Sequence, residues 1–348
     1  MGLLKKITNW EQWPFAVLYA PLAPVWVYYM CRSGAVWFFT PSNPKITFGG
    51  LLGEPKKEMH GLLPGDLCPV HFNVQPGTSF EELTQKMREM NLDYPVFAKP
   101  EVGEQGILVR KLENEEQLRF YHSQVPFEYF IQQSVTYPME VSLFYYRHPW
   151  EKKGHITGFL HKIPLEVTGD GKRTMLELIL DDPKASRYAE RLKKRHEGKL
   201  GSIPQMGEVV KLSNMGNHNQ GAHFVDLKDE IDDRLVRILD DISNPIEDFF
   251  YGRYDILCSG VEELKNRQGF LILEYNGCGA EPNHFYDTGY TLPKAYAEIL
   301  KHWKQLSIIS RYNRKQGIRY WPFIKGWKFM RQTNKYFKQA RLIDQIVP

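Results

Sequence analysis

Two late segments of the chain, GRYDILCSG and GFLILEYNG, alternate charged or amide side chains with apolar ones. Each segment predicts a β-strand, and side chains alternate across a strand. Arg253 and Asp255 therefore share one face of the first strand. Glu274 and Asn276 share one face of the second. If the two strands pair as a hairpin, all four side chains converge.

Burying two carboxylates among apolar neighbours is costly unless a cation compensates them. Oxygen ligands in this number suit Mg2+, with Mn2+ as an alternative, far better than zinc. The same alternation is also typical of the polar outer face of a half-exposed antiparallel sheet. These residues alone leave both interpretations open.

A second segment, YPVFAKPEVGEQG, ends a short apolar strand at Lys99. Gly103 and Gly106 follow within seven residues. Glycines let backbone N–H groups approach a phosphate, which the ammonium group neutralises. This segment predicts a phosphate-binding loop, with a surface lysine before an ordinary hairpin turn as the alternative.

The elements around these segments indicate a sheet-rich chain. Thr78 and Ser79, followed by Glu81 and Glu82, predict a capped amphipathic helix. We expect further helices over residues 114–124, 174–180, 229–241 and 292–306, and strands over residues 94–99, 107–111, 129–135, 140–147, 154–162, 252–258 and 269–275. The strands at 140–147 and 154–162 are expected to form an antiparallel pair.

The order of these features resembles the ATP-grasp family, whose members include D-alanine–D-alanine ligase, the ATP-grasp part of cyanophycin synthetase and glutathione-forming ligases. Its members are similar in having a lysine at a strand end, a glycine-rich loop, a hinge strand and a late D…ExN set. The resemblance covers residues 54–305 and implies an α+β fold in which two lobes grip ATP. It implies an aromatic-rich N-terminal region (1–53), a small lobe (54–135), a large lobe with the metal site (136–306) and a basic aromatic tail (307–348).

Carried over to this chain, the resemblance implies a nucleotide site and a magnesium site. Its nucleotide-binding residues would be Lys56 or Lys57, Lys99, the loop residues Glu104, Gln105 and Gly106, the hinge residues Gln132, Gln133 and Val135, and the ribose-binding Glu140. Its magnesium ligands would be Asp255, Glu274 and Asn276. Arg253 would stabilise charge on the transferring phosphoryl group. Gln132 departs from the acidic residue that many relatives have at that position.

Two other segments, VTGDGKRTMLELI and KLSNMGNHNQGAHFVD, are similar to segments of cyanophycin-synthetase-type ligases. Lys211 and Asn217 in the second would face the substrate, with an ordered loop that closes the lobe as the alternative. His284 lies in a turn that replaces the Pro-Gly turn common in relatives, and it is a further substrate candidate. His161, His218, His223 and His284 do not show metal-ligand spacing in the sequence.

The resemblance implies a ligase that activates a carboxylate as an acyl phosphate and joins it to an amine, with ADP and phosphate as products. Such chemistry mainly requires positioning and charge neutralisation. A small-molecule kinase, or a membrane-associated protein that binds nucleotide without turnover, are the alternatives. The sequence does not identify the carboxylate or the amine, and a thiol in place of the amine stays open.

Composition and charge indicate which kinds of partner and which cellular location to expect. The net charge of +4 is too small to indicate nucleic-acid binding, and four scattered cysteines fit the cytoplasm. Residues 13–30 form an aromatic run broken by prolines, and residues 311–348 carry ten Lys or Arg but one acidic residue. These two segments predict either peripheral association with the inner face of a membrane or packing on the protein body. A homodimer is compatible with the sequence, which does not determine the oligomeric state.

Overall fold

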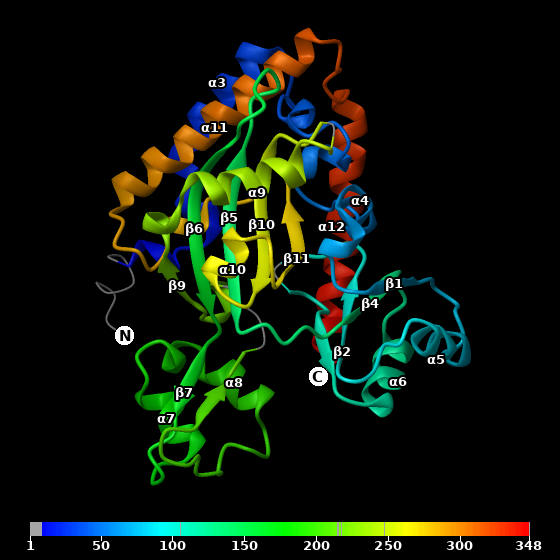
Figure 1. Ribbon diagram of the computed structural model, residues 1–348, viewed down its shortest axis with the longest axis vertical. Helices are drawn as coiled ribbons and strands as arrows, with labels where there is room; N and C mark the ends of the chain where they lie inside the picture. Colours follow the sequence, from blue (N-terminus) through cyan, green and yellow to red (C-terminus); the bar gives the residue numbers. More distant parts are fainter. Residues whose placement is uncertain (1–8, 105, 214–215, 217, 247, 348) are drawn as a thin grey trace.

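We describe the protein from a computed structural model, over residues 9–104, 106–213, 216, 218–246 and 248–347 (Figure 1). Across these residues the chain forms two larger antiparallel sheets, a two-stranded sheet and the helices that pack on them. The α+β class predicted from the sequence is confirmed. In Figure 1 the five-stranded sheet occupies the centre, and the four-stranded sheet lies below it and to the right.

The five-stranded sheet carries most of the predicted site. In spatial order its strands are β11 (Phe270–Asn276), β10 (Tyr251–Cys258), β5 (Met139–Tyr146), β6 (His155–Ile163) and β9 (His223–Asp226). Helices α9 (Asp233–Ser243) and α10 (Val261–Lys265) pack on it. Apolar residues of α9 at helical spacing, such as Leu235 and Leu239, join the core with Val141 and Ile256 of the strands. The opposite face carries the polar residues of the site together with apolar residues such as Phe144, Leu160 and Tyr251, which pack against α11 (Leu292–Lys315) and the N-terminal segment.

The four-stranded sheet has the order β1 (His71–Val74), β4 (Tyr129–Gln133), β2 (Val96–Pro100) and β3 (Arg110–Leu112). Helices α5 (Phe80–Glu89) and α6 (Glu115–Gln124) share its core, and α4 (Lys56–Leu62) precedes it in the chain. Helix α5 begins with a capping box, because Ser79 and Glu82 each accept a hydrogen bond from the backbone of the other. The predicted capped helix is confirmed.

A smaller unit follows β6 in the chain and lies at the lower left of Figure 1. It comprises β7 (Glu166–Thr168), β8 (Val209–Lys211), α7 (Met175–Asp181) and α8 (Ala189–Arg195). Leu165, Ile179, Leu192 and Leu212 form a core of its own. This unit therefore does not depend on the central sheet for its apolar packing.

The aromatic run near the N-terminal end folds as short helices that change direction around its prolines. They are α2 (Phe15–Tyr19), the 3-10 helix η2 (Ala20–Leu22) and α3 (Ala23–Ser33). They pack beside α11 (Leu292–Lys315), where the ring of Trp26 lies 4.9 Å from that of Trp303. At least half of the side-chain surface of Phe15, Val17, Val27 and Tyr28 stays exposed. Within the described part of the chain, none of the helices has the length and apolarity needed to cross a bilayer.

The basic tail continues α11 to Lys315 and then forms a second long helix, α12 (Phe323–Asp344), which runs down the right side of Figure 1 to the four-stranded sheet. Ala340 joins the core of that sheet, and Asp344 pairs with Arg110 at 3.0 Å. The start of the helix is different, because Phe323, Ile324 and Trp327 are exposed. The tail helix therefore packs on the body near both ends, through Trp37 at Phe323 and through Ala340, while its first turns leave these three side chains exposed.

Buried Asn43 ties the N-terminal segment to the start of β10. Its side-chain oxygen accepts hydrogen bonds from the N–H groups of Phe250 and Tyr251, both at 3.0 Å. Its amide nitrogen donates to the carbonyls of Tyr251 at 2.8 Å and Gly49 at 3.2 Å. One side chain thus satisfies four backbone groups in a water-free position.

We predict that Asn43→Ala lowers the free energy of unfolding by about 3 kcal/mol, because each buried polar group left without a partner costs roughly 1–3 kcal/mol. Urea unfolding followed by circular dichroism measures this change. Asn244→Ala is the matched control, since it removes one exposed hydrogen bond to the Lys152 carbonyl. The control should change stability by less than about 0.5 kcal/mol. Equal effects of the two substitutions would contradict the prediction.

Candidate active site

The pairing of β10 with β11 brings the four late side chains together. Arg253 lies opposite Asn276, and Asp255 lies opposite Glu274. Residues directly opposite in an antiparallel pair project to the same face. The predicted pairing of these two strands is therefore confirmed, and its register places a guanidinium, two carboxylates and an amide side by side.

Asp255 is the centre of a buried ion cluster. Its Oδ1 lies 2.8 Å from Lys162 Nζ and 3.2 Å from Arg253 Nε. Its Oδ2 accepts a hydrogen bond from Asn276 Nδ2 at 3.3 Å. Burial works against ionisation of Asp255, but the charges of Arg253 and Lys162 hold its pKa below the ordinary value. The carboxylate is therefore ionised and fixed in place by two cations.

Lys162 is a residue that the sequence analysis missed. It lies on β6, is 5% exposed, and bridges Asp255 and Glu140, the latter at 3.2 Å. Strand pairing sets Glu140 directly opposite Lys162. The signal was present in the sequence, because end-to-end antiparallel pairing of the expected strands at 140–147 and 154–162 puts these two residues together.

Lys56 supplies the counter-charge for Glu274. Its Nζ lies 2.6 Å from Glu274 Oε1. Burial alone would lower the pKa of Lys56, but the charge and hydrogen bond of Glu274, together with the charges of Glu54 and Glu101, raise it. Consecutive residues of a helix point about 100° apart, and Lys57 accordingly turns outward to Glu128, 3.5 Å away. Of the two lysines between which the sequence left the choice open, Lys56 is the one that lies at the ion cluster.

Lys99 approaches the same cluster from β2 of the other sheet. Burial lowers its pKa to about 8, while the charges of Glu274 and Lys56 act on it in opposite directions. The nearest aromatic rings, those of Phe97 and Phe130, lie 5.8 and 5.9 Å from its Nζ. Among the described residues, Lys99 has no ion pair within 4.0 Å, so its charge is desolvated without a direct partner.

Arg253 is held from a second side by the chain that follows β11. Its Nη1 donates a hydrogen bond to the carbonyl of Glu281 at 3.2 Å. The side chain of Glu281 in turn accepts hydrogen bonds from Tyr19 at 2.8 Å and Tyr286 at 3.0 Å. Burial raises the pKa of Glu281. Sequence reasoning missed this contact, because nothing local connects Tyr19 of α2 with a residue 262 positions later.

The donor set fits a magnesium ion. Asp255 and Glu274 supply carboxylate oxygens, and the amide nitrogen of Asn276 points to Asp255, which leaves its oxygen for another partner. Glu274 has a side chain that is 39% exposed, and only its Oε1 is engaged by Lys56. Hard oxygen ligands of this kind, with positions left for phosphate oxygens, are what Mg2+ prefers.

The residues of the expected phosphate loop and hinge differ from one another in exposure and in their contacts. Glu104 pairs with Arg341 of α12 at 2.8 Å, so its side chain is engaged by the tail helix. Gly106 has a φ of 79°, which a residue with a side chain would rarely adopt. Gln105 lies outside the described residues. Gln133 is exposed, Val135 is half-buried between β4 and β5, and Glu140 belongs to the ion cluster.

Gln132 differs from the rest of the hinge because it is buried and its Nε2 has no hydrogen-bond partner among the described residues. In the sheet it lies opposite Phe97, while Phe130 lies opposite Lys99. Alternation on these two strands puts Gln132 and Lys99 on the same face. A buried amide donor is thus oriented toward the side of the sheet that carries the lysine.

The substrate candidates are not gathered at this cluster. Lys211 is exposed on β8, where it pairs in register with Glu166 of the smaller unit. Asn217 lies outside the described residues. The ring of His284 is buried against Glu298 and His302 of α11, and its expected role at the substrate stays a prediction. The packing of α11 on the chain after β11 decides this, and the sequence did not reveal that packing.

No family model matches the chain, and no curated protein matches its sequence. Among solved structures, it is similar to a bifunctional glutathione synthetase from Pasteurella multocida at 17% identity and a TM-score of 0.38, over 72% of this chain and 36% of that one. It is similar to the VanG D-Ala:D-Ser ligase from Enterococcus faecalis at 13% identity and a TM-score of 0.41, over 73% of this chain and 61% of that one.

A D-alanine–D-alanine ligase from Bacillus anthracis is similar at 13% identity and a TM-score of 0.39, over 75% of this chain and 68% of that one. These are enzymes of the kinds that the sequence resemblance named, so the expected likeness is found. The matched region spans well under two thirds of the glutathione synthetase. At TM-scores below 0.5 the likeness carries no argument about function, which rests on the site itself.

We predict that Lys99→Met stabilises the ligand-free protein at pH 7 by roughly 1–3 kcal/mol, because it removes a desolvated charge. The folded pKa of about 8 lies below that of an unfolded lysine, so the folded state binds fewer protons between these values. The gain should therefore be complete below pH 8 and shrink as the pH rises toward 10.

Chemical unfolding of wild type and variant at pH 7 and pH 9.5 measures this difference. Lys194→Met, at an exposed position of α8, serves as the control. A Lys99→Met variant that is less stable than wild type at pH 7 would show that the lysine has a direct partner.

Proposed function

We propose that this chain is an ATP-dependent carboxylate–amine ligase that activates a carboxylate as an acyl phosphate, joins it to an amine and releases ADP and phosphate. The observation that carries this proposal is the convergence of Lys56, Lys99 and Arg253 around Asp255 and Glu274, where the two sheets meet. A site with cations from both sheets and a desolvated lysine suits a polyanionic ligand, because phosphoryl transfer depends on positioning and charge neutralisation.

Lys99 and Lys56 would bind the phosphates. A phosphate oxygen beside Lys99 would supply the counter-charge that the ligand-free site lacks, and it would raise the pKa that burial lowers to about 8. Lys56 is already protonated beside Glu274 and would share its charge with a phosphate. The two ammonium groups would thereby hold the nucleotide from two different elements.

Arg253 would stabilise the charge that develops on the transferring phosphoryl group. Asp255 and the carbonyl of Glu281 hold its guanidinium from two directions, so little reorganisation is needed at the moment of reaction. Fixed donors of this kind lower a barrier where negative charge appears. Arg253 also lies next to Asn276 in the strand register, which links it to the proposed metal ligands.

Asp255, Glu274 and Asn276 would hold Mg2+. When bound, this ion supplies charge neutralisation for the phosphate oxygens. The three side chains contribute ligand oxygens that are already placed by Lys162, Lys56 and the β10–β11 register. Preorganisation of the ligands avoids the cost of gathering two carboxylates when the nucleotide arrives.

Gln132 would bind the base of the nucleotide. Its buried amide donor lacks a partner among the described residues and shares a face with Lys99. A ring nitrogen of a purine is an acceptor of the right kind for that donor. The distance along the strands between Gln132 and Lys99 would then set the base and the phosphates at opposite ends of one site.

The reaction is tested by supplying ATP, Mg2+ and panels of amino acids and peptides with hydroxylamine in place of the natural amine. An acyl phosphate reacts with hydroxylamine to give a hydroxamate, so a carboxylate substrate should give a hydroxamate and ADP in equal amounts. A stable phosphorylated product that forms without any amine would identify the chain as a kinase. ATP binding without ADP release over the whole panel would favour a binding protein without turnover.

We predict that Glu274→Gln lowers ATP turnover by at least about 100-fold and leaves the fold intact, because removing a ligand charge weakens Mg2+ binding where the phosphates sit. Its partly exposed side chain can rehydrate, so unfolding should change little. Glu262→Gln is the matched control, because it breaks a surface pair with Arg234. Full turnover in Glu274→Gln would remove the residue from the metal site.

We further propose that the protein works at an anionic membrane surface. The first turns of α12 alternate the exposed apolar residues Phe323, Ile324 and Trp327 with Lys325 and Lys328. Apolar insertion and attraction to anionic headgroups add in binding strength. Each cation near such a surface contributes about 1 kcal/mol.

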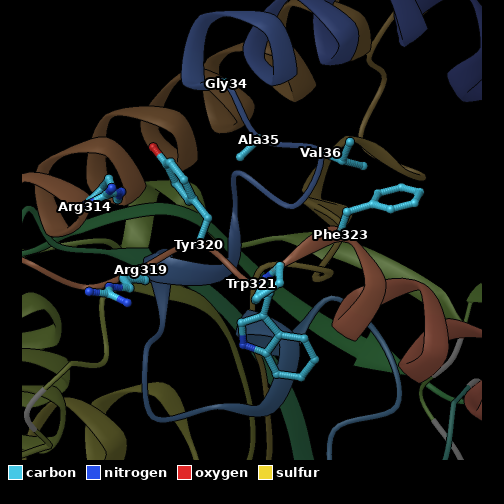
Figure 2. Close-up of a pocket in the computed structure, with 9 residues that line it drawn as sticks. Gly34, Ala35, Val36, Arg314, Arg319, Tyr320, Trp321 and Phe323 are labelled. Atoms are coloured by element: carbon cyan, nitrogen blue, oxygen red, sulfur yellow. The ribbon is translucent and has the colours of Figure 1, made fainter.

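A cavity of about 430 Å³ lies beside this surface, between the end of α3 and the chain that enters α12 (Figure 2). Figure 2 shows Arg314 and Arg319 at one end, Tyr320 and Trp321 between, and Phe323 at the other end beside Val36. Two guanidinium groups at one end and apolar rings at the other match a phosphate headgroup joined to an acyl chain. The cavity therefore supports a lipid as the occupant.

We predict that the protein sediments with vesicles of phosphatidylserine and phosphatidylcholine, and not with phosphatidylcholine alone, and that salt weakens the binding. Ile324→Ser combined with Trp327→Ser should reduce binding, because it removes the inserted apolar surface. Ile203→Ser combined with Met206→Ser, at exposed apolar residues of the smaller unit, is the matched control. A wild-type protein that stays in the supernatant with both vesicle types would overturn the proposal.

A further inference from the structure

A second cluster of ionisable side chains lies inside the protein, beside α11. Glu298 and His302 stand one helical turn apart on the same face of that helix. His284, in the 3-10 helix η9 (Asn283–Phe285), packs against both. The two histidines are 5% and 3% exposed. None of these residues belongs to the candidate active site described above.

The imidazole rings lack the hydrogen bonds that buried polar rings normally make. Neither ring nitrogen of His284, nor Nε2 of His302, has a hydrogen-bond partner among the described residues. Glu298 Oε1 lies 3.5 Å from His284 Nε2 and 3.4 Å from His302 Nε2. A charge-assisted hydrogen bond between such groups would be about 2.7–2.9 Å long. The three atoms converge without bonding to one another.

Their spacing fits a shared ion. Ligand atoms held at about 2.0–2.1 Å around a tetrahedral centre lie roughly 3.4 Å apart. All three ligand atoms lie within 4.8 Å of one another.

We propose that His284, Glu298 and His302 form a binding site for a divalent transition metal ion of the Zn2+ class, with an exogenous ligand such as water completing its coordination. Two imidazole nitrogens and one carboxylate favour Zn2+ and related ions over Mg2+ and Ca2+, which prefer oxygen ligands. The second oxygen of Glu298 contacts Lys301, whose side chain is 71% exposed, so this edge of the cluster lies toward solvent.

The ring of His284 is confined on its other side. A Cβ atom at Gly158 of β6 would lie 2.1 Å from His284 Nδ1, so only glycine leaves room for the ring there. His302 is confined as well, with Tyr251 Oη 3.4 Å from its Nδ1 and the ring of Phe144 at 4.3 Å. Packing, and not a hydrogen bond to the carboxylate, thus fixes both rings with their Nε2 atoms toward Glu298.

The ion would have a structural role. His284 follows Glu281, whose carbonyl holds Arg253, and His302 contacts Tyr251 at the start of β10. A metal ion at this point would clamp the chain after β11 to α11. It would restrain the segment that positions Arg253 without touching the substrate.

Another His–Glu–His group on the surface provides a built-in control. His148 Nδ1 lies 2.8 Å from Glu151 Oε2, and His155 Nε2 lies 3.3 Å from the same oxygen. The remaining nitrogen of His148 is hydrogen-bonded to Gln305. This group is partly exposed and its nitrogens have partners, so it does not need an ion.

The test uses full-length protein stripped with a chelator, in the absence of nucleotide. Equilibrium dialysis with Zn2+ followed by metal analysis should give about one tightly bound ion per chain in wild type and in the control His148→Gln/His155→Gln. Glu298→Gln and His302→Gln should each bind Zn2+ at least about 100-fold more weakly, because a ligand is lost. Saturating Zn2+ should raise the melting temperature of wild type by roughly 5 °C and leave these two variants unchanged.

Co2+ gives a readout that does not depend on the variants. In wild type it should produce the intense visible absorption of a four- or five-coordinate ion with nitrogen ligands. Glu274→Gln should retain this spectrum, which separates the site from the proposed Mg2+ site. A wild-type chain that binds no Zn2+, a Glu298→Gln variant that binds as tightly as wild type, or a weak octahedral Co2+ spectrum would each overturn the proposal.

Discussion

The ion cluster around Asp255 is the constraint on which the rest of the site depends. A carboxylate buried in a sheet is tolerated only when cations and hydrogen bonds replace the water it loses. Lys162 and Arg253 do this from strands on either side of β5, so the register of β6, β5 and β10 is coupled to one charge. A slip by one residue in any of these pairs would send a charged side chain to the apolar face.

The charges of the large sheet are thereby balanced, whereas the small sheet contributes Lys99 without a direct partner. This imbalance at the meeting of the sheets is the feature on which our proposal of an anionic ligand rests. The same low polarity that makes an unpaired ammonium costly makes its pairing with a phosphate strong. The desolvated ammonium group of Lys99 thus lowers the stability of the ligand-free protein, and the same desolvation would strengthen the phosphate binding that we propose.

Local periodicity was enough to predict much of this site from the sequence. Alternation on two strands was enough to group Arg253, Asp255, Glu274 and Asn276, because the period of a strand fixes the face of each residue. Lys162 was missed because its role depends on strand pairing with β5. The histidine cluster was missed for a related reason, since Glu298 and His302 are one turn apart but the third member comes from a segment packed against α11. Sequence spacing reveals ligands within one element and not those that tertiary packing brings together.

Helix α12 restricts how the two larger sheets can move relative to each other. With 22 residues it is about 33 Å long. At one end the carbonyl of Phe323 accepts a hydrogen bond from Trp37, and at the other Arg341 and Asp344 fasten the segment around Glu104 to Arg110. The helix is a stiff rod joined to both halves of the protein. Separating the two sheets therefore requires the rod to tilt or slide as a whole, a collective motion of the microsecond-to-millisecond class rather than the swing of a loop.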